Sequence, residues 1–267
     1  MRTSALPPQT AGESVPGVIA ATSGPESAAG DLRQRAREFA EPLLTGEVTS
    51  SGEALLDHAD ATADILAGIG GSGELQAAVY LSYASAQLNR PEDVIAKAFG
   101  EGFARLAVEA SQLERVQQRS RSRANRQALS GDSEQASQQT EYVRKMLLAF
   151  SRDLRVVLLR LASRLQTLRW CASVRRPPAP SLLRESHDVF APLANRLGIW
   201  QIKWEMEDLV FRFQEPETYK LVASLLDEKR VEREASLEQR RAQIESALRS
   251  QGIQATVTGR PKHISSI

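Results

Sequence analysis

The sequence contains a His-Asp pair, His187-Asp188, whose side chains could take part in catalysis. Imidazole and carboxylate groups are common ligands for catalytic metal ions, so the pair raises the hypothesis of a metal-dependent hydrolase. The alternative is that both are partly exposed helix residues, with Asp188 solvated or paired locally. We favour this second interpretation.

Five arginines form a second candidate, within a run of Gln, Ser and Asn that extends to Gly131. They are Arg115, Arg119, Arg121, Arg123 and Arg126. We expect a solvated loop between helices. Arginine also pairs with phosphate, so a phosphate- or RNA-binding loop is the alternative, although no aromatic residues are interleaved for base stacking.

Composition indicates a soluble, cytoplasmic protein without a membrane partner. The chain has 267 residues, 42% of them hydrophobic and 25% charged, which is enough for one large domain or two ordinary ones. The net charge of +1 argues neither for nor against a nucleic-acid partner. Cys171 is the only cysteine, which excludes a disulfide framework and suits a reducing cytosol. No apolar run approaches the roughly 18 residues of a membrane span.

Helical spacing dominates the chain after residues 1–30, an arm rich in Pro, Gly, Ser, Thr and Ala that we expect to be disordered. Helices are predicted at 54–68, 91–99, 140–170 (one helix, or two broken near 151–153), 182–197, 199–213 and 217–250, with a linker at 175–181. Gly252 is expected to stop the last helix. Ile253, Ala255 and Val257 then alternate with polar residues, which predicts a strand. A lone strand lacks a sheet, so we expect a truncated chain.

The segment "APLANRLGIW" (191–200), followed by "QIKWEMEDLVFRF", resembles a signature of the long RelA/SpoT alarmone synthetase/hydrolases. The segments "EPETYKLVASLLDEKRVERE" (215–234), "GRPKHI" (259–264) and "VRKMLLAFSRDLRVVLLRLASRL" (143–165) belong to the same pattern. The resemblance covers about 45–267, and its most specific part is 186–264.

The resemblance implies a helical HD-type domain that removes the 3′-pyrophosphate of (p)ppGpp with Mn²⁺. A Mg²⁺-dependent synthetase domain would follow, transferring pyrophosphate from ATP to GTP or GDP, and then regions that sense uncharged tRNA on the ribosome. The expected fold is an all-α, HD-domain-like bundle, followed by connecting helices and the first strand of a truncated mixed α/β synthetase domain. The expected bounds are 1–30 for the arm, 31–180 for a degenerate hydrolase domain, 181–252 for the connecting helices and 253–267 for the start of the synthetase.

The hydrolase positions implied by the resemblance are mostly substituted. His58 falls on the first metal ligand, Leu81 and Ser82 on the ligand His-Asp pair, Ser85 and Ala86 on the catalytic Glu-Asp pair, and Ser163 on the last ligand. Thr49 and Ser50 replace a basic pair that holds substrate, and Thr167 and Trp170 fall on substrate contacts. His187-Asp188 falls outside this set. One ligand of four survives, so we expect neither a bound metal nor hydrolase activity.

On the synthetase side, Arg260 and Lys262 match positions that hold the ATP phosphates in the family. Ser265 replaces a usual tyrosine, and the family's later catalytic residues fall beyond Ile267. The chain alone should therefore bind no catalytic cofactor and make no alarmone.

The leading hypothesis is the amino-terminal, pseudo-hydrolase and regulatory part of a synthetase-only, RelA-type GTP pyrophosphokinase of the stringent response. One alternative is a metal-dependent (p)ppGpp 3′-pyrophosphohydrolase with rearranged ligands. Another is a non-enzymatic helical module that binds nucleotide or RNA through the arginine run.

Overall fold

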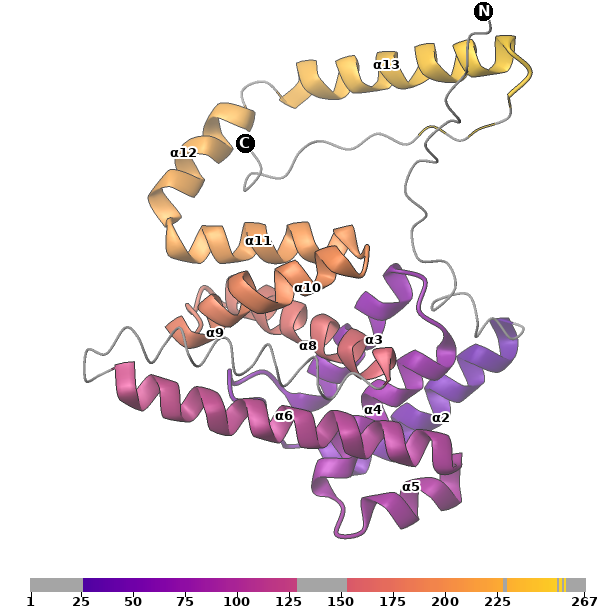
Figure 1. The fold of residues 1–267 in the computed structure, drawn as a ribbon, viewed down its shortest axis with the longest axis vertical. Coiled ribbons are helices and arrows are strands. Elements are labelled where there is room, and N and C mark those ends of the chain that lie inside the picture. The colour runs from indigo at the N-terminus through magenta and orange to yellow at the C-terminus, as the bar shows by residue number, and fades with distance from the viewer. Residues whose placement is uncertain (1–25, 129–152, 228–229, 254, 256, 258–267) are drawn as a thin grey trace, which may run out of the picture.

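A computed structural model describes residues 26–128, 153–227, 230–253, 255 and 257 (Figure 1). The regular elements of these residues are helices: α2 (Glu26–Leu44), α3 (Leu55–Gly68), α4 (Gly73–Gln87), α5 (Pro91–Phe99), α6 (Glu101–Ala128), α8 (Leu154–Ser173), α9 (Pro180–Glu185), the π-helical turn η1 (Ser186–Phe190), α10 (Ala191–Arg196), α11 (Trp200–Gln214), α12 (Pro216–Asp227) and α13 (Arg230–Ser250). The all-α prediction is confirmed. None of the described helices is long and apolar enough to span a membrane.

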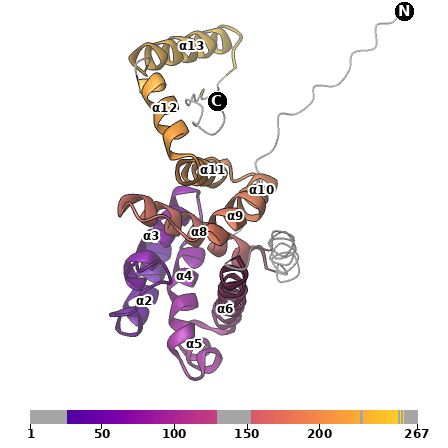
Figure 2. The same cartoon turned by 90° about the vertical axis from the view of Figure 1, so that its left-hand side faces the viewer.

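The core forms around α4, which packs against α2, α3 and α6 (Figures 1 and 2). Its apolar residues are buried almost all round, and Tyr80 and Leu81 are fully inaccessible to solvent. On a second side of the bundle, α8 packs against α3 and α11. The helix α8 is similarly buried, with Leu161 and Leu165 at its centre. The two buried helices α4 and α8 therefore fix the frame to which the other helices attach.

Local sequence explains where several helices begin and end. Ser72 caps α4 by accepting a hydrogen bond from the Leu75 N–H, and Asp153 caps α8 in the same way through the Arg155 N–H. The start of α8 coincides with the break predicted near 151–153. The prediction of a helix at 91–99 is confirmed, with Pro91 in the first turn. Gly252, at a φ of 75°, follows the end of α13 as predicted.

Two predictions of local structure were wrong. The arginine run, predicted as a loop, lies in α6 as far as Ala128, because Arg, Gln and Ala are good helix formers and the segment contains no Pro. The predicted single helix 217–250 is two helices, α12 and α13, which run in different directions (Figure 1). Tyr219 holds α12 against Phe211 of α11, with ring centroids 6.0 Å apart, whereas α13 is rich in charged residues.

One buried cation helps to attach the connecting helices, which also pack on α8 through α11. Arg164 of α8 donates to the Glu185 carboxylate at 2.9 Å and to the Leu182 carbonyl at 3.1 Å. Its guanidinium also lies over the Phe190 ring, 4.2 Å from the centroid. Both charged side chains are almost fully buried, at 2% and 3% exposed. The turn from α9 through η1 is therefore fastened directly to α8.

The predicted strand at 253–258 and the pair Arg260 and Lys262 lie mostly or wholly outside the described residues. Ile253, Ala255 and Val257 are described and belong to no strand. The predicted arm is also mostly outside the description, and α2 begins at Glu26 within its last residues.

Candidate functional site

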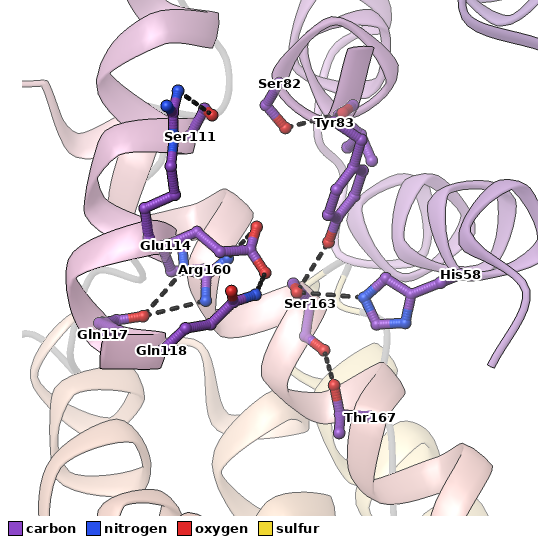
Figure 3. Close-up of polar contacts among 12 residues, drawn as sticks. His58, Ser82, Tyr83, Ser111, Glu114, Gln117, Gln118, Arg160, Ser163 and Thr167 are labelled. Atoms are coloured by element: carbon purple, nitrogen blue, oxygen red, sulfur yellow. Dashed lines mark hydrogen bonds and ion pairs between the residues drawn. The ribbon is translucent and has the colours of Figure 1, made fainter. Parts of the chain in front are cut away.

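A cavity of about 360 Å³ lies between the loop at 47–51 and helices α3, α4, α6 and α8. We call it the His58 cavity. Its wall is rich in hydroxyl groups, from Thr49, Ser50, Ser51, Ser82, Tyr83, Ser111, Ser163 and Thr167. Figure 3 shows five of them, Ser82, Tyr83, Ser111, Ser163 and Thr167, which come from three helices. Sequence-predicted positions from distant segments are therefore brought together around one cavity.

His58 forms the centre of a buried hydrogen-bond network. Its Nδ1 lies 2.6 Å from Oε2 of Glu53, and its Nε2 lies 3.1 Å from Oγ of Ser163. Nδ1 therefore faces a carboxylate oxygen and Nε2 faces a hydroxyl, and the tautomer of the imidazole decides which nitrogen donates. Gln166 donates to the other Glu53 oxygen at 2.5 Å. His58, Glu53, Ser163 and Gln166 are all buried, and the network holds the imidazole in one orientation.

Tyr83 completes this network and was missed by the sequence analysis. Its hydroxyl donates to Ser163 Oγ at 2.8 Å, and its ring packs edge-on against His58 with centroids 5.5 Å apart. Ser82, Tyr83, Ala86 and Gln87 line the cavity from α4. The positions expected from sequence for the His-Asp and Glu-Asp pairs, 81, 82, 85 and 86, have the same spacing. The residues that line the cavity are therefore each one position later. The only sequence signal for Tyr83 was a weak one: it stands among the small residues Ser82, Ala84 and Ser85 in α4.

The positions matched to the hydrolase metal site do not fit a metal ion. Two ligands about 2.1 Å from one ion stand roughly 3 Å apart, which is the separation of His58 Nε2 and Ser163 Oγ. The spacing alone would therefore suit two ligands, but a serine hydroxyl is a poor ligand and the other matched positions supply none. Leu81 is fully buried in the core, and Ser82 donates to the Val79 carbonyl at 2.8 Å. No group of three or more His, Cys, Asp or Glu residues within the described ranges is arranged to hold a metal.

The remaining catalytic positions are also engaged or inert. Ser85 is buried and donates to backbone carbonyls of Ser82 and Ala107, at 2.9 and 3.3 Å. Ala86 is exposed at the cavity edge. Neither has a side chain able to exchange a proton with a bound substrate near neutral pH.

Opposite His58, the cavity contains a compensated charge pair (Figure 3). Arg160 of α8 lies 3.0 Å from a Glu114 oxygen of α6 and donates to Gln117 Oε1 at 2.9 Å. Arg160 is only 5% exposed. This pair ties α6 to α8, so its arginine is already committed to protein partners.

The His187-Asp188 pair lies elsewhere. Both residues are exposed on η1, and His187 Nδ1 lies 2.7 Å from Asp188 Oδ1. The interpretation of a local, partly exposed pair is confirmed, and neither residue lines the His58 cavity.

Tyrosine burial predicts a loss of stability at alkaline pH. Burial, with the nearby charge of Glu114, raises the pKa of Tyr83, and burial with a hydrogen bond to Asp60 raises the pKa of Tyr80 to about 12. Because the unfolded phenols ionise near pH 10, this stability is complete below pH 10 and is lost as pH rises through the folded pKa. In urea unfolding at pH 8 to 11.5, Tyr83→Phe should make the decline in unfolding free energy shallower. An equally steep decline would contradict the assignment.

Comparison with known proteins gives consistent matches. The model of the HD domain family matches residues 36–200. The chain is 35% identical over 231 residues to a probable guanosine-3′,5′-bis(diphosphate) 3′-pyrophosphohydrolase of Synechocystis, covering 86% of this chain and 29% of that protein. It is 42% identical over 132 residues to the GTP pyrophosphokinase of Escherichia coli K12, covering 49% and 18%.

A third relative, the guanosine-3′,5′-bis(diphosphate) 3′-pyrophosphohydrolase of Haemophilus influenzae, is 33% identical over 219 residues, covering 82% of this chain and 30% of that protein. The chain thus spans less than a third of the length of each of these curated relatives. Their names include both a pyrophosphohydrolase and a pyrophosphokinase. With an HD domain over most of its helical bundle, the chain belongs to the RelA/SpoT family.

Proposed function

We propose that this chain is the amino-terminal, pseudo-hydrolase part of a GTP pyrophosphokinase. In the longer protein it would act as a scaffold that restrains or positions a synthetase domain. The observation that best supports this proposal is the donor set at the matched positions, where His58 is joined by Leu81, Ser82 and Ser163 and by no carboxylate.

The chemistry of the donors supports loss of hydrolysis. A catalytic metal has to be held by several ligands to lower the pKa of its water from 15.7 to about 7. The cavity offers one imidazole, whose two nitrogens already engage Glu53 and Ser163. Serine hydroxyls are poor substitutes for carboxylate and imidazole ligands.

This conclusion does not depend on the register assigned to α4. In the register read from sequence, Leu81 and Ser82 stand at the ligand positions. In the register that follows the cavity wall, Ser82 and Tyr83 stand there. Neither register provides a carboxylate or a second imidazole. The alternative is a pyrophosphohydrolase, the activity in the name of the Haemophilus influenzae relative. That activity would require metal ligands at positions other than the matched ones.

The substrates expected for the longer protein follow from the pyrophosphokinase named among the relatives. The longer protein would use ATP and GTP or GDP with Mg²⁺, in the cytoplasm. Ribosome and uncharged tRNA would be recognised by regions outside this chain. These partners are expectations for the full-length protein.

The decisive test is hydrolysis of ppGpp by the purified chain with Mn²⁺. We expect no release of pyrophosphate and no Mn²⁺-dependent rise in melting temperature. A metal that binds only the folded state would add about 2.7 kcal/mol to stability at 100 times its dissociation constant, which a thermal scan detects. The Haemophilus influenzae relative serves as the positive control. Metal-dependent turnover that is lost in His58→Ala would establish the hydrolase alternative.

A further inference from the structure

A second cavity, of about 310 Å³, lies where α8 ends and the chain turns into α9. We call it the Arg176 cavity. It shares Ser50 and Ser51 with the wall of the His58 cavity but is lined on its other side by Cys171, Arg176 and Ser181. None of these three residues has a part in the proposed function.

The polar side chains in the described lining of this cavity can all donate a hydrogen bond, and that of Arg176 can only donate. Among the described residues that line it, Arg176 is the only charged one and none is a carboxylate. Ser181 is 4% exposed, and among the described residues its Oγ has no hydrogen-bond partner. A buried hydroxyl in that state has lost its bonds to water without replacement, so it is a candidate donor to a ligand.

The end of α8 directs Arg176 over the cavity. The Arg176 N–H donates to the Cys171 carbonyl at 3.0 Å and the Arg175 N–H to the Ala172 carbonyl, with Arg175 at a φ of 55°. These bonds form a Schellman turn, in which glycine is usual at the left-handed position. The nearest backbone partner of the guanidinium is the Ser51 carbonyl, at 3.5 Å. That contact is at the limit of a hydrogen bond, so the guanidinium retains donors for a ligand.

We propose that the Arg176 cavity binds an oxyanion of the phosphate class, held by the Arg176 guanidinium and the Ser181 hydroxyl. A guanidinium and a hydroxyl match the acceptor-only oxygens of phosphate, and a charge-assisted bond gives most of the affinity. The volume of about 310 Å³ exceeds that of a free phosphate ion. The cavity therefore has room for a phosphate ester as well as for the free anion.

The test is calorimetric titration of the whole chain with inorganic phosphate, at an ionic strength kept constant with sodium chloride. Arg176→Gln should weaken binding about tenfold or more, since it removes a charge-assisted donor. Arg175→Gln is the matched control, because it makes the same charge change one residue away in a side chain that does not line the cavity. Equal affinities for Arg176→Gln and Arg175→Gln would overturn the proposal.

Ser181→Ala separates a ligand role from a structural one. The variant removes a buried hydroxyl without a partner, so without phosphate it should melt at the same or a higher temperature than the wild type. With phosphate it should lose most of the rise in melting temperature. A phosphate response equal to that of the wild type would exclude Ser181 and overturn the proposed pair.

Cys171 provides an independent readout, since it lines the cavity and is the only cysteine of the chain. Bound phosphate should slow its alkylation by N-ethylmaleimide, in the wild type but not in Arg176→Gln. Protection by phenyl phosphate as well as inorganic phosphate would indicate an ester, and protection by inorganic phosphate alone a free anion. Protection by neither would refute the site. None of these outcomes depends on Mn²⁺ or hydrolysis, so this proposal and the pseudo-hydrolase proposal fail separately.

Discussion

Replacing Arg164 with methionine should lower the free energy of unfolding by about 3–5 kcal/mol. The substitution leaves Glu185 as a buried carboxylate without its 2.9 Å partner, and it also removes the cation from the face of Phe190. Both side chains of the pair are almost inaccessible, so water cannot take over the lost interaction. Urea unfolding of the wild type and the variant measures the difference.

The chain offers a matched control for this measurement. Arg169, five residues along α8, pairs with Glu205 of α11, but its side chain is 43% exposed. Arg169→Met should cost less than about 1 kcal/mol, because solvent screens an exposed pair. The double variant Arg164→Met/Glu185→Leu should recover much of the loss of the single variant, since no charge is then buried alone. Similar losses for the Arg164 and Arg169 variants would contradict the role given to burial.

The same pair bears on how the bundle could act as a scaffold. Arg164 lines the His58 cavity and fastens α9 and η1, which lead into α10 and α11. In the proposed scaffold role, such a connection would hold α9 and η1 at a fixed angle to α8, with no catalysis required of the bundle.

Sequence patterns predicted the fold better than the site. Apolar spacing and single cap residues such as Pro91 and Gly252 act locally, so helix type and several helix ends could be predicted. The arginine run was misjudged because its low apolar content suggested a loop, whereas its helix propensity prevailed in α6. The division of the predicted helix 217–250 into α12, which packs on α11, and α13 is not encoded by apolar periodicity.

The site depended on contacts between distant residues. Ser163 and His58 are separated by 105 positions, and Ser163 and Tyr83 by 80, yet they share one hydrogen-bond network. Matching motifs identified His58 and Ser163 but not Tyr83. When a ligand residue is substituted, the motif does not show which other side chain now contacts the remaining ones. The role of Glu53 was missed for the same reason, although it lies only five residues before His58.

The largest effect on activity is expected at Arg260 and Lys262, which fall outside the described residues. Both residues match the ATP-phosphate contacts of the family, and they stand two apart, so a continuing strand would present both on one face. In a chain extended through the full synthetase domain, Lys262→Ala or Arg260→Ala should reduce pyrophosphate transfer from ATP by about 10²-fold or more. Phosphoryl-type transfer depends on charges placed around the phosphates, and loss of one such donor typically costs that much.

Lys220→Ala is the control for this experiment, because Lys220 is an exposed lysine on α12 that pairs only weakly with Glu217 across one turn. The control removes the same charge and should leave transfer near normal. We expect the melting temperatures of all three variants to match that of the parent enzyme. Near-normal transfer by the Lys262→Ala enzyme would remove that residue from the phosphate site. A loss confined to the Michaelis constant for ATP would instead assign it to ground-state binding, because a contact made only in the transition state lowers kcat.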